Sequence, residues 1–411
     1  MRAAPLRFPS HRPFALSRPQ PPSAEPLPPA NRRPFALPAL LAALLLVGTA
    51  GAAGAFPPER RRSYENRAPN EYLAVPAVAS LPGIGVFAGI IASGSNVADT
   101  GVDAAGTVAE SIDKSDISVR AAALREIPVG VPHLTFDYQY ADIRLGNLET
   151  FLPGRNSPNF TIPITARFKF QLLRPILRFW ERRVEVSYTL AFFKGFDLST
   201  SGNEEPLRSH SARANVLLDL TDDGVDPHVG TRLEFGTTLS APHKSIFGED
   251  TGTRSTFGRN NEVRVHTYGA TFFLPLAERM VLAWSNQYFE AVGDVPPGTV
   301  VRGGSPPLRG YPGNRWSDRY GVFSGVEARY IYPMGRRLDI LIAHGVLETL
   351  QVALFYEVGQ VSPDPNQTLF DHMHQSYGFG VRALFEAIVL RFDLADSDEG
   401  VQTHLTIGHA F

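Results

Sequence analysis

Four carboxylates in one short run are the first residues of this sequence that could do chemistry. They are Asp219, Asp222, Asp223 and Asp226. Clustered carboxylates suit a hard cation such as calcium. A polar turn between two strands explains the same run without a metal, because Asp residues favour turns. We favour the turn and predict no metal here.

A second polar cluster, Asp371, His372 and His374, has the residue types of a transition-metal site. Pro363 and Pro365 shortly precede it and indicate a loop. We therefore expect these side chains to be solvated rather than bound to a metal.

Nucleophilic catalysis has weak support. Ser111 and Lys114 fit the pattern S-x-x-K, but its partner motifs S-D-N and K-T-G are absent, and so is G-x-S-x-G. Ser209, His210 and Ser211 indicate a polar turn before a strand. The sequence has no cysteine, which excludes disulfides, thiolate metal sites and Cys nucleophiles. We expect no enzymatic activity and no cofactor.

The composition favours strands and argues against nucleic acid as a partner. The formal net charge is -2 over 411 residues with no long basic block, whereas phosphate neutralisation needs a concentrated positive face. Phe (27) and Tyr (13) are spread between many Gly (36) and Pro (34) residues. This is typical of strands joined by turns.

Residues 1–55 have the pattern of a leader and a secretory signal peptide. Arg32 and Arg33 precede a short apolar run, and residues 53–55 form an A-x-A-like end, so cleavage is predicted before Phe56. A single N-terminal membrane anchor is the alternative. We assign residues 56–81 to a short periplasmic segment.

Apolar and polar residues alternate along several segments, as in half-buried strands. The clearest are residues 134–141, 166–172, 184–192 and 213–220. We assign their apolar faces, which include Phe136, Phe168 and Tyr188, to lipid, and their polar faces to a lumen. A soluble β-sandwich would also alternate. Strands of about 8–10 residues with faces rich in Phe and Tyr favour a membrane barrel.

Residues 82–411 are predicted to form one all-β domain, a transmembrane antiparallel β-barrel. At roughly 20 residues for each strand and its connection, this span allows about 16 strands. The first strand is expected to carry Gly83, Gly85 and Gly89, which would weaken its pairing.

From about residue 261 onward, the sequence resembles the BamA/TamA superfamily of outer-membrane assembly and secretion barrels. The motifs occur in the family's order: residues 281–283, 293–296, 303–304, 308–311, 327–329, 355–359 and 390–395. Upstream, residues 219–230 resemble a turn of the family. Glu357 stands where the family usually has Asp. Residues 56–81 are too few for the family's periplasmic POTRA modules, so we expect a barrel-only member.

The resemblance implies that Arg309, Gly310 and Tyr311 lie on an extracellular loop that folds back into the lumen. Alternation independently points further charged side chains inward, namely Glu327, Arg329, Glu357, Arg391 and Asp393. We predict that Arg309 pairs with Glu357, near Gly359, with Glu327 as a second partner, and so locks the loop. An ordinary solvated loop position for Arg309 is the alternative.

The function that the resemblance implies is insertion or translocation of outer-membrane proteins. The location would be the bacterial outer membrane, and the partners would be its lipid, the barrel assembly machinery and client outer-membrane proteins. The seam between the first and last strands would open and offer its backbone groups to an incoming strand. A passive structural barrel or pore is the alternative.

The last strand resembles the assembly signal of such barrels. Its residues are Leu405, Ile407, Gly408 and Phe411. We predict that deleting Phe411, or extending the chain beyond it, lowers the amount of barrel in the membrane, because the recognised aromatic ending is lost. Quantitative membrane fractionation measures this, and unchanged membrane levels would count against the signal.

Overall fold

The structure is a computed structural model. It describes residues 70–81, 85–112, 118–145, 148–151, 159–162, 166–197, 207–241, 263–293, 301–303, 307–312, 315–366, 369–385 and 388–407. The predicted signal peptide, Gly83, Lys114, Gly408 and Phe411 lie outside these residues.

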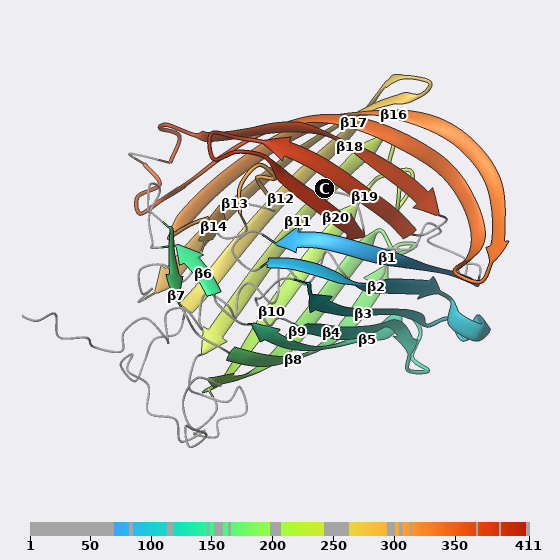
Figure 1. Cartoon of the computed structure of the whole chain (residues 1–411), viewed down its shortest axis with the longest axis horizontal. Coiled ribbons are helices and arrows are strands. Elements are labelled where there is room, and N and C mark those ends of the chain that lie inside the picture. Colours follow the sequence, from blue (N-terminus) through green and yellow to red (C-terminus); the bar gives the residue numbers. More distant parts are fainter. Residues whose placement is uncertain are drawn as a thin grey trace, which may run out of the picture. The chain divides into compact units, whose positions relative to one another are not determined.

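One antiparallel sheet of sixteen strands contains most of the described residues (Figure 1). In sheet order its strands are β1 (Glu71–Leu81), β2 (Gly85–Ser95), β3 (Asp103–Ser111), β4 (Ser118–Pro128), β5 (Leu134–Leu145), β8 (Ala166–Phe179), β9 (Val184–Asp197), β10 (Leu207–Asp219), β11 (Gly230–Ala241), β12 (Val263–Ala277), β13 (Met280–Gly293), β16 (Tyr320–Ile340), β17 (Ala343–Ser362), β18 (His374–Phe385), β19 (Ile388–Asp396) and β20 (Gln402–Ile407).

Two short hairpins lie apart from this sheet. They are β6 (Leu148–Phe151) with β7 (Asn159–Ile162), and β14 (Val301–Gly303) with β15 (Trp316–Asp318). The described residues also include a 3-10 helix, η2 (Val97–Asp99). Within the described ranges, no helix has the length and apolar character needed to cross a membrane.

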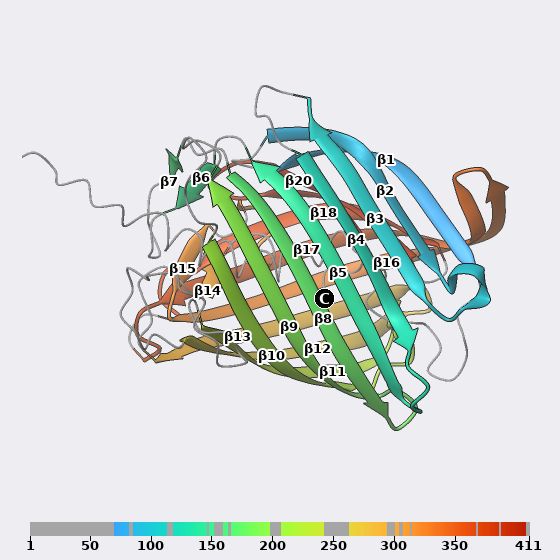
Figure 2. The same ribbon diagram turned by 90° about the horizontal axis from the view of Figure 1, so that it is seen from below.

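The sheet closes on itself through its first strand. On β1, Tyr72 pairs with His344 and Leu73 with Ala343 of β17, and the backbone N–H of Ala74 donates to the carbonyl of Ile342 at 2.7 Å. Figure 2 shows the tilted strands lying side by side along the wall. The predicted all-β, antiparallel, closed barrel is thereby confirmed.

The closed ring has thirteen strands, not sixteen, and β18, β19 and β20 lie outside it. The reason is the length of β17. It begins at Ala343, but its pairing with β18 begins only at Leu347, so its first residues have an edge open to β1. The predicted count of 16 matches the sheet but not the ring.

The sheet also begins before the predicted boundary at residue 82. Strand β1 occupies eleven residues of the segment assigned to the periplasm, and the glycine-bearing strand with Gly85 and Gly89 is second in order. Pro76 obscures β1 in the sequence, because proline removes a backbone donor and is tolerated mainly near a sheet edge.

Most strands have one apolar face directed outward and one polar face directed inward. Exposed side chains on the outer face include Tyr138, Tyr188, Phe235, Tyr268, Trp284 and Leu354. Charged side chains on the inner face are buried, among them Asp137, Asp219, Glu327, Glu357 and Arg382. Residues that pair directly across two strands lie on the same face of the sheet. Knowing which residues of one strand face inward therefore fixes which residues of the next strand do.

Strand β8 departs from the predicted orientation. Phe168, Phe170 and Leu172 face inward and are buried, while Arg167 is exposed. The register requires this, because Phe170 pairs with buried Phe193 of β9. The two-residue alternation separates the two faces of a strand. It does not show which face lines the lumen where the lumen itself is apolar.

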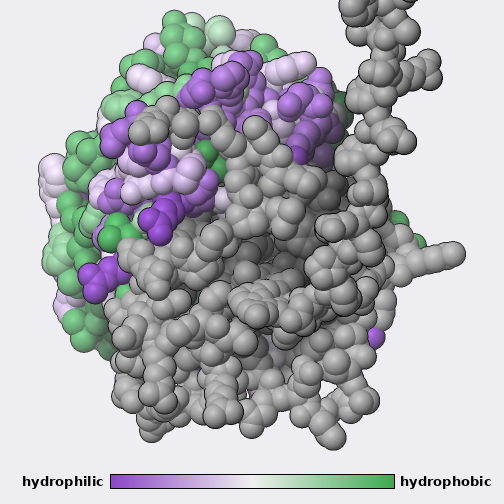
Figure 3. Space-filling view, turned by 90° about the vertical axis from the view of Figure 1, so that its left-hand side faces the viewer, coloured by the Kyte–Doolittle hydropathy of each residue, from purple (hydrophilic) through white to green (hydrophobic). Residues whose placement is uncertain are grey.

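The two ends of the barrel differ. Strands β5 and β13 end, and β8 and β16 begin, at one end of the barrel, called the long-loop end because residues 146–165 and 294–319 connect these strands in the sequence. Turns such as 180–183 and 341–342 join strands at the other end, the short-turn end. Figure 3 looks onto the end near β6, β7 and β14, where described hydrophobic residues (green) lie on the outer rim and hydrophilic ones (purple) lie farther in.

Candidate functional site

The segment between β13 and β16 folds inward from the long-loop end. Leu308, Arg309, Tyr311 and Trp316 are each no more than 2% exposed. A solvated loop residue would expose much of its surface, so the segment lies inside the wall of strands.

Arg309 lies among three carboxylates. Its Nε donates to Oε1 of Glu357 at 2.6 Å, and its backbone N–H donates to the other oxygen of that carboxylate at 2.7 Å. Its Nη1 donates to Glu327 at 2.9 Å and to Asp393 at 3.1 Å. The guanidinium also stacks on Phe355, with its carbon 3.4 Å from the ring centroid. One side chain thus connects β16, β17 and β19.

Three further guanidinium groups complete this cluster. Arg329 donates to Glu327 at 2.8 Å, and Nε of Arg391 lies 3.0 Å from a carboxylate oxygen of Asp393. Arg382 lies 2.9 Å from Glu327 and 2.7 Å from Asp393. Four cations therefore surround three carboxylates in a buried site, where ion pairs are strong only if each charge has a partner.

The charge of Arg309 is well stabilised. Burial alone would lower the pKa of its guanidinium, but the nearby carboxylates of Glu357, Glu327 and Asp393 outweigh burial and raise that pKa. Arg309 therefore keeps its positive charge in the buried site.

Aromatic packing holds the rest of the segment. Tyr311 lies edge-on to Trp316 with ring centroids 4.5 Å apart, and Trp316 stacks on His374 of β18 at 3.7 Å. The hydroxyl of Tyr311 donates to Asp398 at 2.5 Å. Burial and this hydrogen bond raise the pKa of Tyr311. The segment is thus attached to β18 and to the connection between β19 and β20.

Backbone contacts explain the glycine that follows Arg309. The N–H of Gly310 donates to Ser376 at 2.7 Å, and its carbonyl accepts from Ser397 at 2.7 Å. A Cβ at this position would lie 2.7 Å from the carbonyl oxygen of Asp396. Gly359 is constrained in the same way, since a Cβ there would lie 2.1 Å from the ring of Phe323.

A second segment folds inward at the short-turn end. In the turn between β10 and β11, Thr221, Val225 and Asp226 are buried. Nε2 of Gln351 on β17 donates to Asp226 at 2.7 Å. The strands β12, β13 and β16 separate β11 from β17, so this contact spans about 19 Å of wall, at about 4.8 Å for each inter-strand step. The turn therefore crosses the lumen.

Three carboxylates of this turn accept hydrogen bonds from its own backbone. Asp222 accepts the N–H groups of His228 and Val229, and Asp223 accepts those of Val225 and Asp226. Asp219 accepts the backbone N–H of Thr221 and also a hydrogen bond from the side chain of Arg232. Three of the four carboxylates weighed above as calcium ligands thus stabilise the polar turn that the sequence predicts. Among the described residues, no group of three or more His, Cys, Asp or Glu is arranged to hold a metal.

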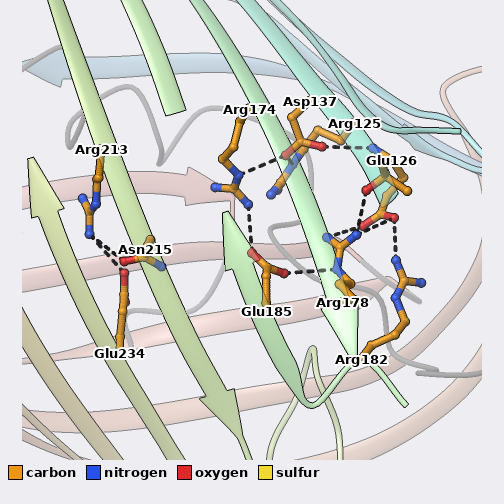
Figure 4. Close-up of polar contacts among 11 residues, drawn as sticks. Arg125, Glu126, Asp137, Arg174, Arg178, Arg182, Glu185, Arg213, Asn215 and Glu234 are labelled. Carbon is orange, nitrogen blue, oxygen red and sulfur yellow. Dashed lines mark hydrogen bonds and ion pairs between the residues drawn. The ribbon is translucent and has the colours of Figure 1, made fainter. Parts of the chain in front are cut away.

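A separate ion network lines the inner face of β4, β5, β8 and β9 (Figure 4). It contains Arg125, Glu126, Asp137, Arg174, Arg178, Arg182 and Glu185. Arg178 lies 2.7 Å from Glu126 and 3.1 Å from Glu185, and Arg125 lies 3.0 Å from Asp137. Glu126 takes a left-handed φ of 58° at a bulge, which directs both Arg125 and Glu126 inward.

Comparison with known proteins identifies the fold of this chain. No protein-family model and no curated protein matches the sequence. Among solved structures, CdiB from Escherichia coli is similar over 82% of this chain and 61% of its own, with a TM-score of 0.53 and 14% identity. That likeness shows the fold alone. This chain therefore shares its barrel fold with an outer-membrane barrel.

Two other solved structures match less well, with TM-scores below 0.5. CdiB from Acinetobacter baumannii matches 82% of this chain and 59% of its own at 13% identity and a TM-score of 0.49. BamA from Haemophilus ducreyi lacking POTRA domains 1-3 matches 82% and 68% at 11% identity and a TM-score of 0.45. This chain spans about three fifths of the length of the two CdiB chains.

The structure brings one predicted set of residues together and leaves another apart. Arg309, Gly310, Tyr311, Glu327, Glu357 and Gly359 lie in or beside the cluster. Leu405 and Ile407 belong to β20, where they pair in register with Phe392 and Leu390 of β19. Asp371 and His372 are exposed at the long-loop end, and Ser111 ends β3.

Sequence reasoning missed several members of the site. Arg382 binds the cluster from β18. Asp393 of β19 was placed inward by alternation, but its pairing with Arg309 was not predicted. The Asp226–Gln351 contact joins residues 125 positions apart and has no local signal.

Replacing Arg309 with Ala should destabilise the barrel by about 3–5 kcal/mol, because buried carboxylates would lose their shared partner. Arg309→Lys should restore only part of the loss, since an ammonium cannot reach Glu357 and Glu327 in the fork geometry. Denaturant unfolding of the purified barrel measures both.

Arg315→Ala is the matched control in the same segment. Its more exposed pair with Glu399 should contribute about 1 kcal/mol or less. Equal losses in both alanine variants would contradict the cluster's importance.

Gln351→Glu should destabilise the inward turn by at least about 2 kcal/mol, because it sets a carboxylate against Asp226 in a buried site. Combining it with Asp226→Asn should recover most of that loss, since donor and acceptor are then exchanged. A double-mutant cycle of unfolding free energies measures the coupling. Simple addition of the two single effects would show that the residues do not interact.

Proposed function

We propose that this chain is an outer-membrane β-barrel that takes part in the insertion or translocation of other outer-membrane proteins. The observation that carries the proposal is the Arg309 cluster. The motif that suggested the family resemblance is buried against inward carboxylates of β16, β17 and β19. A lumen occupied by this segment favours a role other than that of an open, water-filled channel.

The outward apolar face supports the membrane location. Large side chains are exposed on the lipid-facing positions of many strands, including Tyr188, Phe235, Trp284, Tyr330 and Phe379. An exposed apolar surface of this kind is unfavourable in water and favourable in a bilayer. We place the long-loop end at the cell surface, because outer-membrane barrels have short periplasmic turns and longer extracellular loops.

The proposed mechanism is physical rather than enzymatic. Backbone groups exposed at a sheet edge are very costly in lipid, so an open edge would template pairing by a client strand. The closure of the ring supports this, because the described part of β1 pairs with β17 through two residue pairs, against eleven with β2. The proposed partners are outer-membrane lipid, client outer-membrane proteins and the barrel assembly machinery.

Proteoliposomes containing the full chain test the proposal. An unfolded eight-stranded outer-membrane barrel is added as client, and its folding rate is compared with that in empty liposomes. We expect faster folding with the wild type and with Arg315→Ala, and slower folding with Arg309→Ala. Ion conductance without any acceleration of folding would overturn the proposal in favour of a passive pore.

A further inference from the structure

The buried cluster around Arg309 contains one more cation than it contains carboxylates. Arg309 and Glu357 form one neutral pair, joined by two hydrogen bonds, so the remaining members decide the balance. These members are three guanidinium groups and two carboxylates, those of Arg329, Arg382, Arg391, Glu327 and Asp393. With all five ionised, three positive charges and two negative charges leave a net charge of +1.

The two carboxylates are already shared by several arginines. Three nitrogen atoms contact the oxygens of Glu327. Three more contact those of Asp393, from Arg309 at 3.1 Å, from Arg382 at 2.7 Å and from Arg391 at 3.0 Å. Within the described ranges, Arg391 forms an ion pair with Asp393 alone, and Arg309 contacts the same oxygen of that carboxylate.

Arg391 also lies opposite another cation. It pairs in register with Arg382 of β18, and like charges directly opposite each other destabilise a sheet. Arg382 has a carboxylate on either side, with its nitrogens 2.9 Å from Glu327 and 2.7 Å from Asp393. Arg391 has only its share of Asp393, so the excess positive charge is concentrated there.

Unused hydrogen-bonding groups lie at the same place. In the described part of the chain, Nη1 of Arg391 and the hydroxyl oxygen of Thr406 are buried and have no hydrogen-bond partner. Thr406 of β20 pairs in register with Arg391, so the two side chains share one face of the sheet. A hydroxyl and a guanidinium N–H can both donate to one acceptor, and burying such donors without an acceptor is unfavourable.

Arg391 is the guanidinium of this group that keeps contact with open space. Its side chain is 10% exposed, whereas those of Arg329 and Arg382 are 1% and 0% exposed. The next residue, Phe392, is exposed on the outer face, so Arg391 points into the barrel. A small ion in the lumen can therefore approach Arg391, while protein atoms enclose the other two guanidinium groups.

The inward turn at the short-turn end does not supply the missing charge by direct contact. Its buried carboxylate, Asp226, accepts from Gln351 at 2.7 Å. The ion pairs of Arg382 and Arg391 are those with Glu327 and Asp393, and they do not include this turn.

We propose that a small monovalent anion such as chloride binds in the lumen between the guanidinium of Arg391 and the hydroxyl of Thr406. A single negative charge would neutralise the excess cation and would accept hydrogen bonds from both donors. A divalent anion would replace an excess of one sign by an excess of the other. The proposal concerns the folded barrel itself and does not depend on the insertion of client proteins.

Urea unfolding of the full chain in detergent tests the site, at constant ionic strength and with chloride exchanged for the bulkier gluconate. The width of the chloride NMR line reports ion binding directly. The variants are Arg391→Gln, which removes the excess charge, and Thr406→Val, which removes the hydroxyl alone. Arg315→Gln is the matched control, because it removes an arginine whose ion pair with Glu399 lies outside this group.

We expect the unfolding midpoints of the wild type and of Arg315→Gln to rise with chloride concentration, because a ligand that binds the folded state stabilises it. Arg391→Gln should show no chloride dependence and should be at least as stable as the wild type in gluconate, since no excess cation remains. Thr406→Val should bind chloride roughly tenfold more weakly, as expected for the loss of one hydrogen bond to a charged group.

Four results would count against the inference. Equal midpoints of the wild type in chloride and in gluconate would show that no ion binds. The same chloride dependence in Arg391→Gln as in the wild type, or lower stability of this variant in gluconate, would show that the protein itself neutralises Arg391. Unchanged chloride affinity in Thr406→Val would remove the hydroxyl from the site. Client folding plays no part in these measurements, so the ion site and the insertion function can fail independently.

Discussion

A charge inside a wall of strands must find its counter-charge there, and the Arg309 cluster meets this requirement. Glu327 has no exposure to solvent, and Asp393 has none either. Leaving such carboxylates without cations would cost several kcal/mol each. The inward fold of the loop, the glycines that let it approach and the convergence of β16 to β19 all depend on this neutralisation.

Strand β17 has an unusual share of these contacts. It carries Glu357 and Phe355, which bind the segment from the long-loop end, and Gln351, which binds the turn from the short-turn end. It also closes the ring with β1. Contacts within one network couple energetically. A substitution in either inward segment should therefore change the stability of the pairing between β1 and β17. The two segments therefore belong to one structural unit despite lying near opposite ends.

The sequence was most informative where a local rule applied. Alternation placed Glu327, Glu357 and Asp393 inward. Shifting any of these strands by one residue would turn its apolar side chains inward and its charged side chains outward. Alternation failed on β8, where Phe170 fills an apolar part of the lumen and the polar positions face outward. It also missed β1, whose small residues and Pro76 hide the period. Local rules hold no information on which distant strand completes a ring, so the β1–β17 closure and the Asp226–Gln351 contact required the structure.

The length of the β16–β17 hairpin determines where the ring closes. Strand β16 has 21 residues, or about 70 Å of chain, whereas about 9–11 residues suffice to cross a bilayer. The pairs that join β1 to β17 lie beside the turn at residues 341–342, where Leu341 is 94% exposed. If the barrel spans a bilayer as proposed, this turn lies outside the hydrocarbon, where water can replace a lost backbone partner and a hydrogen bond contributes only about 0.5–1.5 kcal/mol net. The ring thus closes through two residue pairs next to an exposed turn, with the side chain of Ala343 buried at the closure.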